Sequence, residues 1–183
     1  VMIHRQDDAE LRKWLASTPA GIEQEPEYWS AIGNWYQQQE KHEIAIRCLT
    51  EAVLRDDTDR HSFLALARSL KAMGQTADAT RVMERYRLLD RVAFIASEID
   101  RTSEQMSQVV QLLVKLHRTA EARAWNKLAQ QSPQQINTSE VPETGHEEHW
   151  ASCGLNTSDW PLPDFSRLGA RSSIPEEKGF QPG

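Results

Sequence analysis

The sequence has little cysteine and no long apolar run. Cys48 and Cys153 are the only two cysteines among 183 residues, and they lie far apart, so no disulfide framework is expected. No stretch approaches the roughly 18 apolar residues of a membrane-spanning helix. The opening residues, VMIHRQDD, lack the charged-then-apolar pattern of a signal peptide. Because the chain begins with Val and ends at GFQPG, we expect a segment of a longer protein, and the compartment stays open.

The chain also lacks an excess of positive charge. Its net charge is −6, and most of this charge lies in residues 136–183. That stretch holds eight acids (Glu140, Glu143, Glu147, Glu148, Asp159, Asp164, Glu176, Glu177) and three bases (Arg167, Arg171, Lys178). The preceding 135 residues are therefore almost neutral and offer no basic field for nucleic acid. We expect no nucleic-acid partner.

Motifs for phosphate binding and nucleophilic catalysis are missing as well. The sequence contains no G-x-x-x-x-G-K, no G-x-G-x-x-G and no G-x-S-x-G. His146, Glu147, His149 and Cys153 are of zinc-ligand type, but the two histidines are three positions apart rather than the four of a helical zinc motif. The sequence therefore predicts no enzyme, no metal and no cofactor.

What the chain does have is a well-patterned helical stretch at residues 26–59. Trp29, Gly33 and Tyr36 match the tetratricopeptide repeat, a helix–turn–helix unit of about 34 residues. Ile32 and Leu49 stand at its apolar positions; Ala45 and Ala52 fit its second helix, while Asp57 replaces the closing proline. These residues resemble that family. The resemblance implies an all-α, right-handed α-solenoid of helical hairpins, about seven helices in all, with an irregular C-terminal tail.

Two further units follow from the same frame. Stepping by 34 residues places apolar side chains correctly over 60–93, whereas the third unit aligns best at 103–136, nine residues late. The intervening residues contain no Gly or Pro and keep an apolar helical face, so we predict one long helix over 77–99. A break near Asp90 is the alternative. Residues 1–135 would then form the array and 136–183 the tail.

Local signals give the expected helix boundaries. Helices are predicted over residues 8–17, 26–39 and 42–55. Predicted N-caps are Asp7 or Asp8, Asp59, Thr76, and Thr102 in a capping box with Gln105. Gly33 inside a helix predicts close approach of the partner helix, and Gly74 predicts a left-handed turn residue.

The tail has a different composition. Five of the eight prolines and five of the eight glycines lie in residues 136–183, and the apolar periodicity stops there. One island, Trp160-Pro161-Leu162-Pro163-Asp164-Phe165, is apolar and aromatic. A plain linker and a strap that docks back on the helices are both open readings.

The repeat resemblance also implies where a ligand would bind. The family's groove positions fall here on Asn34, Gln37, Gln38, Arg68, Lys71, Gln111 and Lys115. Amides can pair with an extended peptide backbone and cations can hold a carboxylate, so a non-catalytic protein- or peptide-binding scaffold is expected. An ordinary solvated helix face is the alternative.

A narrower resemblance concerns the end of the chain. The long second helix, the unit reading LLVKLHRTAEARAWNKLA and the tail reading WPLPDFS are similar to the repeat region of large bacterial proteins that continue into an FG-GAP β-propeller and an ASPIC/UnbV domain. That resemblance implies a structural spacer or accessory segment of a multidomain protein.

Overall fold

The computed structural model describes residues 8–98 and 102–130, and there the chain is helical throughout. The elements are α1 (Asp8–Ser17), the 3₁₀ turn η1 (Ile22–Gln24), α2 (Pro26–Gln38), α3 (His42–Arg55), α4 (Arg60–Ala72), α5 (Thr76–Ser97), α6 (Ser103–Lys115) and α7 (Thr119–Gln130). No strand occurs in these two ranges. The prediction of an all-α protein with seven helices is confirmed for this part of the chain.

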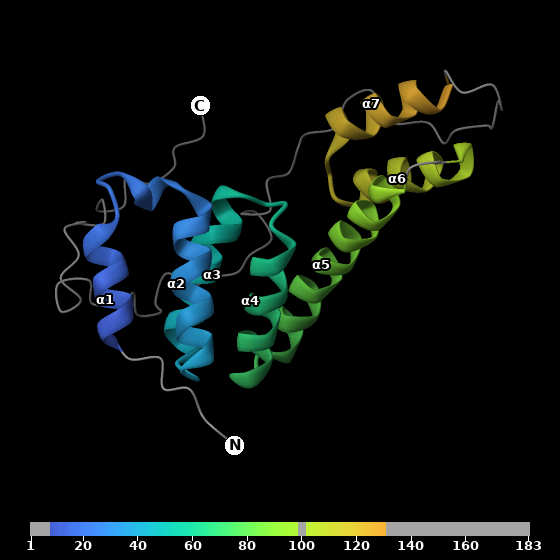
Figure 1. Ribbon diagram of the computed structural model, residues 1–183. Helices are drawn as coiled ribbons and strands as arrows, with labels where there is room; N and C mark the ends of the chain where they lie inside the picture. Colours follow the sequence, from blue (N-terminus) through green and yellow to red (C-terminus); the bar gives the residue numbers. More distant parts are fainter. Residues whose placement is uncertain (1–7, 99–101, 131–183) are drawn as a thin grey trace, which may run out of the picture.

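The helices pack in the order in which they occur. α2 pairs with α3, α4 with α5, and α6 with α7, while α3 contacts α4 and α5 contacts α6. Figure 1 shows α1, α2 and α4 standing side by side, with α5 running past the end of α4 to carry α6 and α7 at its far end. Helices that are neighbours in sequence are therefore neighbours in space, as expected for helical hairpins joined by short turns.

Each of the three hairpins turns in the same way. The central residues have left-handed backbones, with φ of 59° at Glu40, 74° at Gly74 and 60° at His117. In each turn the next amide donates to the carbonyl five residues back: Lys41 to Tyr36 at 3.0 Å, Gln75 to Leu70 at 2.9 Å, and Arg118 to Leu113 at 2.9 Å. This bond defines a Schellman motif. The prediction that Gly74 is a left-handed turn residue is confirmed. The other two turns have Glu40 and His117 at that position instead of glycine.

The spacing of these turns locates the irregularity in the chain. Gly74 follows Glu40 by 34 positions, but His117 follows Gly74 by 43. The extra residues belong to α5, which runs unbroken over Thr76–Ser97. The prediction of one long helix is confirmed, and the alternative of a break near Asp90 is wrong.

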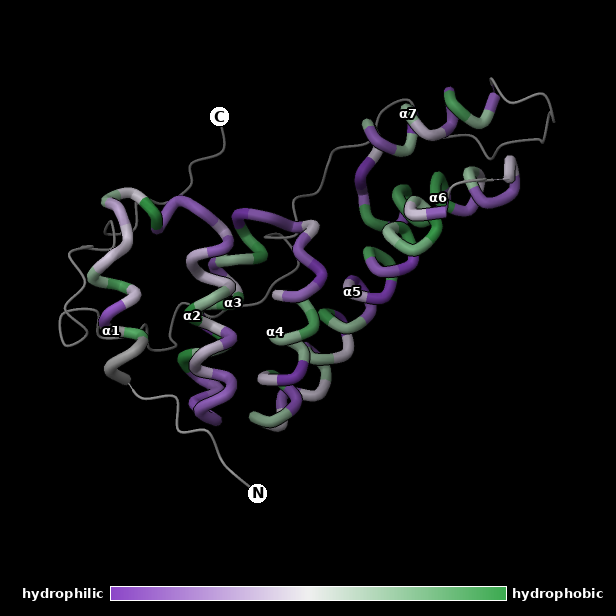
Figure 2. Tube along the Cα trace, in the orientation of Figure 1, coloured by the Kyte–Doolittle hydropathy of each residue, from purple (hydrophilic) through white to green (hydrophobic). Residues whose placement is uncertain are grey.

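The lengthened helix contributes to two separate hydrophobic cores. Its first part packs with α1–α4 through Ala79, Val82 and Leu89, and its last part supplies Ile95 to a second core with α6 and α7. Val92 touches both cores. In Figure 2 the apolar residues of α5 alternate with polar ones along its whole length. α5 therefore contributes both to the core that it forms with the first four helices and to the core that it forms with the last hairpin.

The packing of the first core accounts for the repeat-like pattern of residues 26–59. Trp29 is buried, and its indole N–H donates to the Glu23 carbonyl at 2.7 Å. A Cβ added to Gly33 would lie 2.6 Å from Leu49 Cγ, so the predicted close approach of α3 is confirmed. α1 joins this core through the buried Leu11 and Leu15, and its exposed Trp14 stacks on Tyr28 with ring centroids 5.8 Å apart.

The predicted helix caps agree with the structure at two of three described positions. The Asp59 carboxylate accepts from the His61 amide at 3.0 Å. Thr102 and Gln105 form the reciprocal capping box, with distances of 3.2 and 2.8 Å. Thr76 as a cap is wrong: it is the first residue inside α5, and the cap position is Gln75, which makes no side-chain cap bond. The Schellman turn ends at Gln75, whose amide donates to the Leu70 carbonyl, and α5 begins at the next residue.

Candidate functional site

One predicted groove residue of α2, Gln37, lies against α4, where its amide nitrogen is already hydrogen-bonded. Gln37 Nε2 donates to the Ala65 carbonyl at 2.6 Å and to Ser69 Oγ at 2.7 Å. Farther toward the start of both helices, Ser62 Oγ donates to Ser30 Oγ at 2.8 Å. We call these three bonds the α2–α4 seam. Amide side chains here hold two helices together, which the sequence pattern did not indicate.

Asn34 sits between these bonds on the same helix. Its Nδ2 donates to the Ser30 carbonyl at 2.8 Å, one turn back. This local bond fixes the orientation of the amide, as short polar side chains often do within helices. Asn34 is half-buried, so its side chain is oriented before any partner arrives.

Three other predicted groove residues flank the seam and are exposed. They are Gln38 at the end of α2, and Arg68 and Lys71 on α4. Arg68 and Lys71 are three positions apart, so they are neighbours on one face of the helix. Arg68 adjoins Ser69, which accepts from Gln37. Arg68 and Lys71 are therefore neighbouring exposed cations on α4, next in sequence to a residue of the seam.

The third hairpin is separate from that surface. Gln111 and Lys115 are exposed on α6, and α6 packs against α5 and α7. In Figure 1, α6 lies at the far end of α5, well away from α2. The additional length of α5, which has 22 residues against 14 in α3, is the physical reason, because it moves the last hairpin away from the first two.

A charged junction connects the third hairpin to the first two. Asp57, in the turn between α3 and α4, accepts from Arg85 of α5 at 2.6 Å and from Arg118 at 3.3 Å. Arg85 is buried, and its guanidinium lies 5.5 Å from the Phe63 ring centroid. Arg118 also pairs with Glu121 at the start of α7. One carboxylate therefore ties together α5 and the α6–α7 turn.

Sequence reasoning did not find this junction. The signal that was present is Asp57 itself, which stands where the repeat pattern has proline. Because Asp is also a common turn residue, its presence there did not by itself indicate an ion pair. Its partners, 28 and 61 positions away, could not be chosen from spacing.

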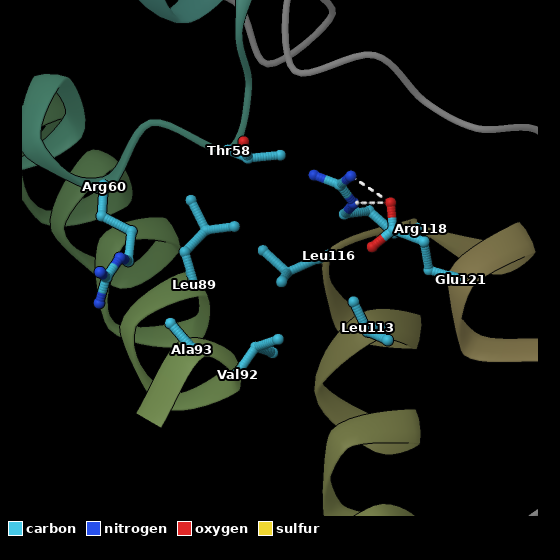
Figure 3. Close-up of a pocket in the computed structure, with 9 residues that line it drawn as sticks. All are labelled: Thr58, Arg60, Leu89, Val92, Ala93, Leu113, Leu116, Arg118 and Glu121. Carbon is cyan, nitrogen blue, oxygen red and sulfur yellow. Dashed lines mark hydrogen bonds and ion pairs between the residues drawn. The ribbon is translucent and has the colours of Figure 1, made fainter. Parts of the chain in front are cut away.

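Beside the junction lies a cavity of about 170 Å³. Figure 3 shows Leu89, Val92 and Ala93 of α5 on one side, with Leu113 and Leu116 from the end of α6 on the other. Thr58, Arg60, Arg118 and Glu121 form its rim. We call this space the junction cavity. It is apolar inside and charged at the edge.

Two features of the described residues that could carry chemistry are the metal-ligand residue types and Cys48. Within residues 8–98 and 102–130, no group of three His, Cys, Asp or Glu side chains is placed to hold a metal ion. The His146–His149 segment and Cys153 lie outside the described residues. Burial raises the pKa of the Cys48 thiol far above its ordinary value, with Arg47 opposing the shift and Glu51 adding to it. This thiol stays protonated and is a packing group, because thiolate is the reactive form.

Among the helices that the structure describes, none is long and apolar enough to cross a bilayer.

Comparisons with known proteins give no relative. The chain matches no protein-family model, no curated protein and no solved structure.

Proposed function

We propose that this chain is a non-catalytic, tetratricopeptide-like module that binds a protein or peptide partner on the exposed face formed by α2 and α4. The observation that carries the proposal is the placement of Arg68 and Lys71, exposed and adjacent on α4, beside the α2–α4 seam. The recurrence of one turn geometry in three hairpins supports a repeat-like module.

The chemistry of this face favours an extended, acidic partner. Arg68 and Lys71 can hold a carboxylate by charge-assisted hydrogen bonds, which are stronger than neutral ones. Gln37 and Asn34 donate inside the protein through their nitrogens, and their carbonyl oxygens are the groups that would accept from a peptide backbone. Gln38 would add a further amide at the edge. The separation of α6 from α2 limits this site to the first two hairpins, so Gln111 and Lys115 would contact only a long partner.

The test begins with a peptide selected from a displayed library by the purified chain. We expect the selected peptide to carry carboxylates, and we expect Arg68→Glu/Lys71→Glu to weaken its binding at least tenfold in fluorescence anisotropy, with unchanged helicity by circular dichroism. Arg87→Glu is the matched control, because Arg87 is exposed on α5. Equal binding by the double variant, or failure to select any peptide, would contradict the proposal.

A structural spacer is the second candidate, and the long α5 favours it. A helix shared by two cores holds the last hairpin at a defined distance from the first four helices, which is what a rigid connector between domains requires. An accessory segment of an FG-GAP/ASPIC-UnbV-type protein would use the chain in this way. The double charge reversal would then leave every interaction of the chain intact.

A further inference from the structure

Two amide side chains of α2 are held in the same orientation. Asn34 Nδ2 donates to the Ser30 carbonyl at 2.8 Å, and Gln37 Nε2 donates to the Ala65 carbonyl at 2.6 Å. A backbone carbonyl accepts hydrogen bonds and cannot donate them, so only the nitrogen of each amide can face these groups. The side-chain oxygens of Asn34 and Gln37 are therefore directed away from the bonds that hold the amides.

These two oxygens have unused acceptor capacity. Within residues 8–98 and 102–130, no group donates a hydrogen bond to Asn34 Oδ1 or to Gln37 Oε1. Neither oxygen is a buried atom, and both residues are half-buried. The two oxygens are therefore in contact with solvent and can accept from a partner. We call Asn34 Oδ1 and Gln37 Oε1 the acceptor pair.

The charges of the neighbouring helix limit which donors can approach the acceptor pair. Arg68 and Lys71 are exposed cations on α4, and Arg68 adjoins Ser69, to which Gln37 donates. They repel a lysine or arginine of the partner, and a carboxylate has no proton to donate. Neutral N–H groups remain, and a peptide backbone supplies one at every residue except proline. The tail of residues 136–183, including its aromatic island, lies outside the described residues, and the acceptor pair belongs to α2 alone.

The spacing of the acceptor pair matches an extended backbone. Asn34 and Gln37 are three positions apart on one helix, so their Cβ atoms are about 5–6 Å apart. In an extended chain the N–H groups of alternate residues point to the same edge, and two residues rise by about 6.6 Å. A helix offers free N–H groups only in its first turn. Given the peptide-binding function proposed for this face, we propose that the acceptor pair binds two backbone N–H groups of partner residues two positions apart.

This contact defines the class of partner more narrowly than its charge does. The bound segment is an extended strand with acidic side chains, and the acceptor pair reads its backbone rather than its side chains. Neither of the two residues whose N–H groups are bound can be proline, because proline has no N–H.

The test is an amide-to-ester scan of the acidic peptide that the purified full chain selects, with binding measured by fluorescence anisotropy. Each ester replaces one backbone N–H by an oxygen atom and leaves the side chains in place. We expect esters at two positions, two residues apart, to weaken binding about fivefold each, since one hydrogen bond contributes roughly that factor. The ester between them should bind like the parent peptide, because that N–H points to the opposite edge.

Variants of the chain assign each peptide position to one side chain. One of the two ester losses should disappear in Asn34→Ala and the other in Gln37→Ala, because the acceptor has been removed. Gln38→Ala is the matched control: it removes an exposed amide of the same helix and should leave both losses at about fivefold. Circular dichroism checks that helicity is unchanged. The scan and Asn34→Ala remain decisive if Gln37→Ala does not fold.

Three results would overturn the proposal: no ester-sensitive position, sensitive positions that are adjacent in the peptide, or losses that persist in both alanine variants. Adjacent positions would identify the first turn of a partner helix, whose free N–H groups are consecutive. If the peptide still requires Arg68 and Lys71 in these cases, the peptide-binding function stands without the acceptor pair. Conversely, the ester pattern without that requirement would support the acceptor pair and contradict the role of the cations. Failure to select any peptide would overturn both.

Discussion

Asp57 stands where the repeat pattern has a helix-ending proline, and it forms ion pairs with residues far along the chain. Where the repeat pattern ends its second helix with proline, this chain has a carboxylate that pairs with Arg85 and Arg118. Within the turn, the Thr58 amide and hydroxyl donate to the Asp56 carboxylate. The ion pairs of Asp57 add contacts from α5 and from the α6–α7 turn to these local bonds.

We expect Asp57→Asn to destabilise the protein by about 2 kcal/mol. Arg85 has a side chain only 8% exposed, so removal of its carboxylate leaves a nearly buried charge without its ion pair; a fully buried case would cost about 3–5 kcal/mol, and the partial exposure of Asp57 reduces the effect. Urea denaturation measures the free energy of unfolding. The matched control is Asp90→Asn, which breaks the exposed pair with Arg60 and should cost at most about 0.5 kcal/mol.

Gly33→Ala should also destabilise, although alanine is the better helix former. The propensity gain is about 1 kcal/mol, but the added Cβ would lie 2.6 Å from Leu49 Cγ and 3.1 Å from the Leu49 backbone nitrogen. Overpacking of this kind costs about 1–3 kcal/mol, so we expect a lower melting temperature. The same change in a Leu49→Ala background should cost less, because the side-chain overlap is gone. Additive losses in the two backgrounds would exclude the overlap as the cause.

Gln37→Leu separates a structural role from a ligand-binding role. It removes the hydrogen bonds to Ala65 and Ser69, and the Ser69 hydroxyl, which belongs to a buried residue, loses this donor, so we expect a loss of about 1–2 kcal/mol. Gln38→Leu, one residue later and exposed, should change stability by less than about 0.5 kcal/mol. Thermal unfolding of the two variants makes the comparison. Equal stabilities would mean that the seam does not hold α2 to α4.

At the scale of elements, the sequence predicted most boundaries, because the signals were local. The predicted helices over 8–17 and 42–55 have the bounds found in the structure, and the capping box before α6 is formed by the expected pair. The long α5 was predictable from missing Gly and Pro together with a continued apolar face. The left-handed backbones of Glu40 and His117 were not predictable, since neither residue is the glycine that usually marks such a position. The 3₁₀ turn η1 was not predicted either, although the left-handed Gly21 precedes it.

Arg91→Pro should uncouple the two cores. Arg91 is exposed in the middle of α5, between the parts that serve each core, and proline inside a helix costs about 3 kcal/mol or more. We expect urea unfolding followed by circular dichroism to change from one transition to two, with the α6–α7 hairpin melting first. Arg91→Ala is the control: it removes the contact with the Phe94 ring at 5.4 Å and should cost about 0.5 kcal/mol. A single transition for the proline variant would show that the junction alone keeps the halves cooperative.

At the scale of the molecule, the order of packing was predictable and the placement of the candidate site was only partly so. Periodicity shows which face of each helix is apolar, and short turns make sequential helices neighbours. The groove positions came from one resemblance that assumes a regular array. Gln37 lies in the α2–α4 seam because its side chain donates to the Ala65 carbonyl of α4. Gln111 lies on a separate hairpin because the spacing between the turns at Gly74 and His117 is nine residues longer than that between Glu40 and Gly74. Neither cause can be read from the sequence around Gln37 or Gln111.

The length of α5 also sets an angle. Eight of the nine extra residues lengthen α5, which has 22 residues against 14 in α3. They advance the attachment point of the last hairpin by about 12 Å and rotate it by about 80° beyond two full turns. Each single residue gained or lost there would swing the hairpin by about 100°. The number of residues between Gly74 and His117 therefore sets the orientation of the α6–α7 hairpin about the axis of α5. Chains that differ only in that number would present the same α6–α7 surface in different directions.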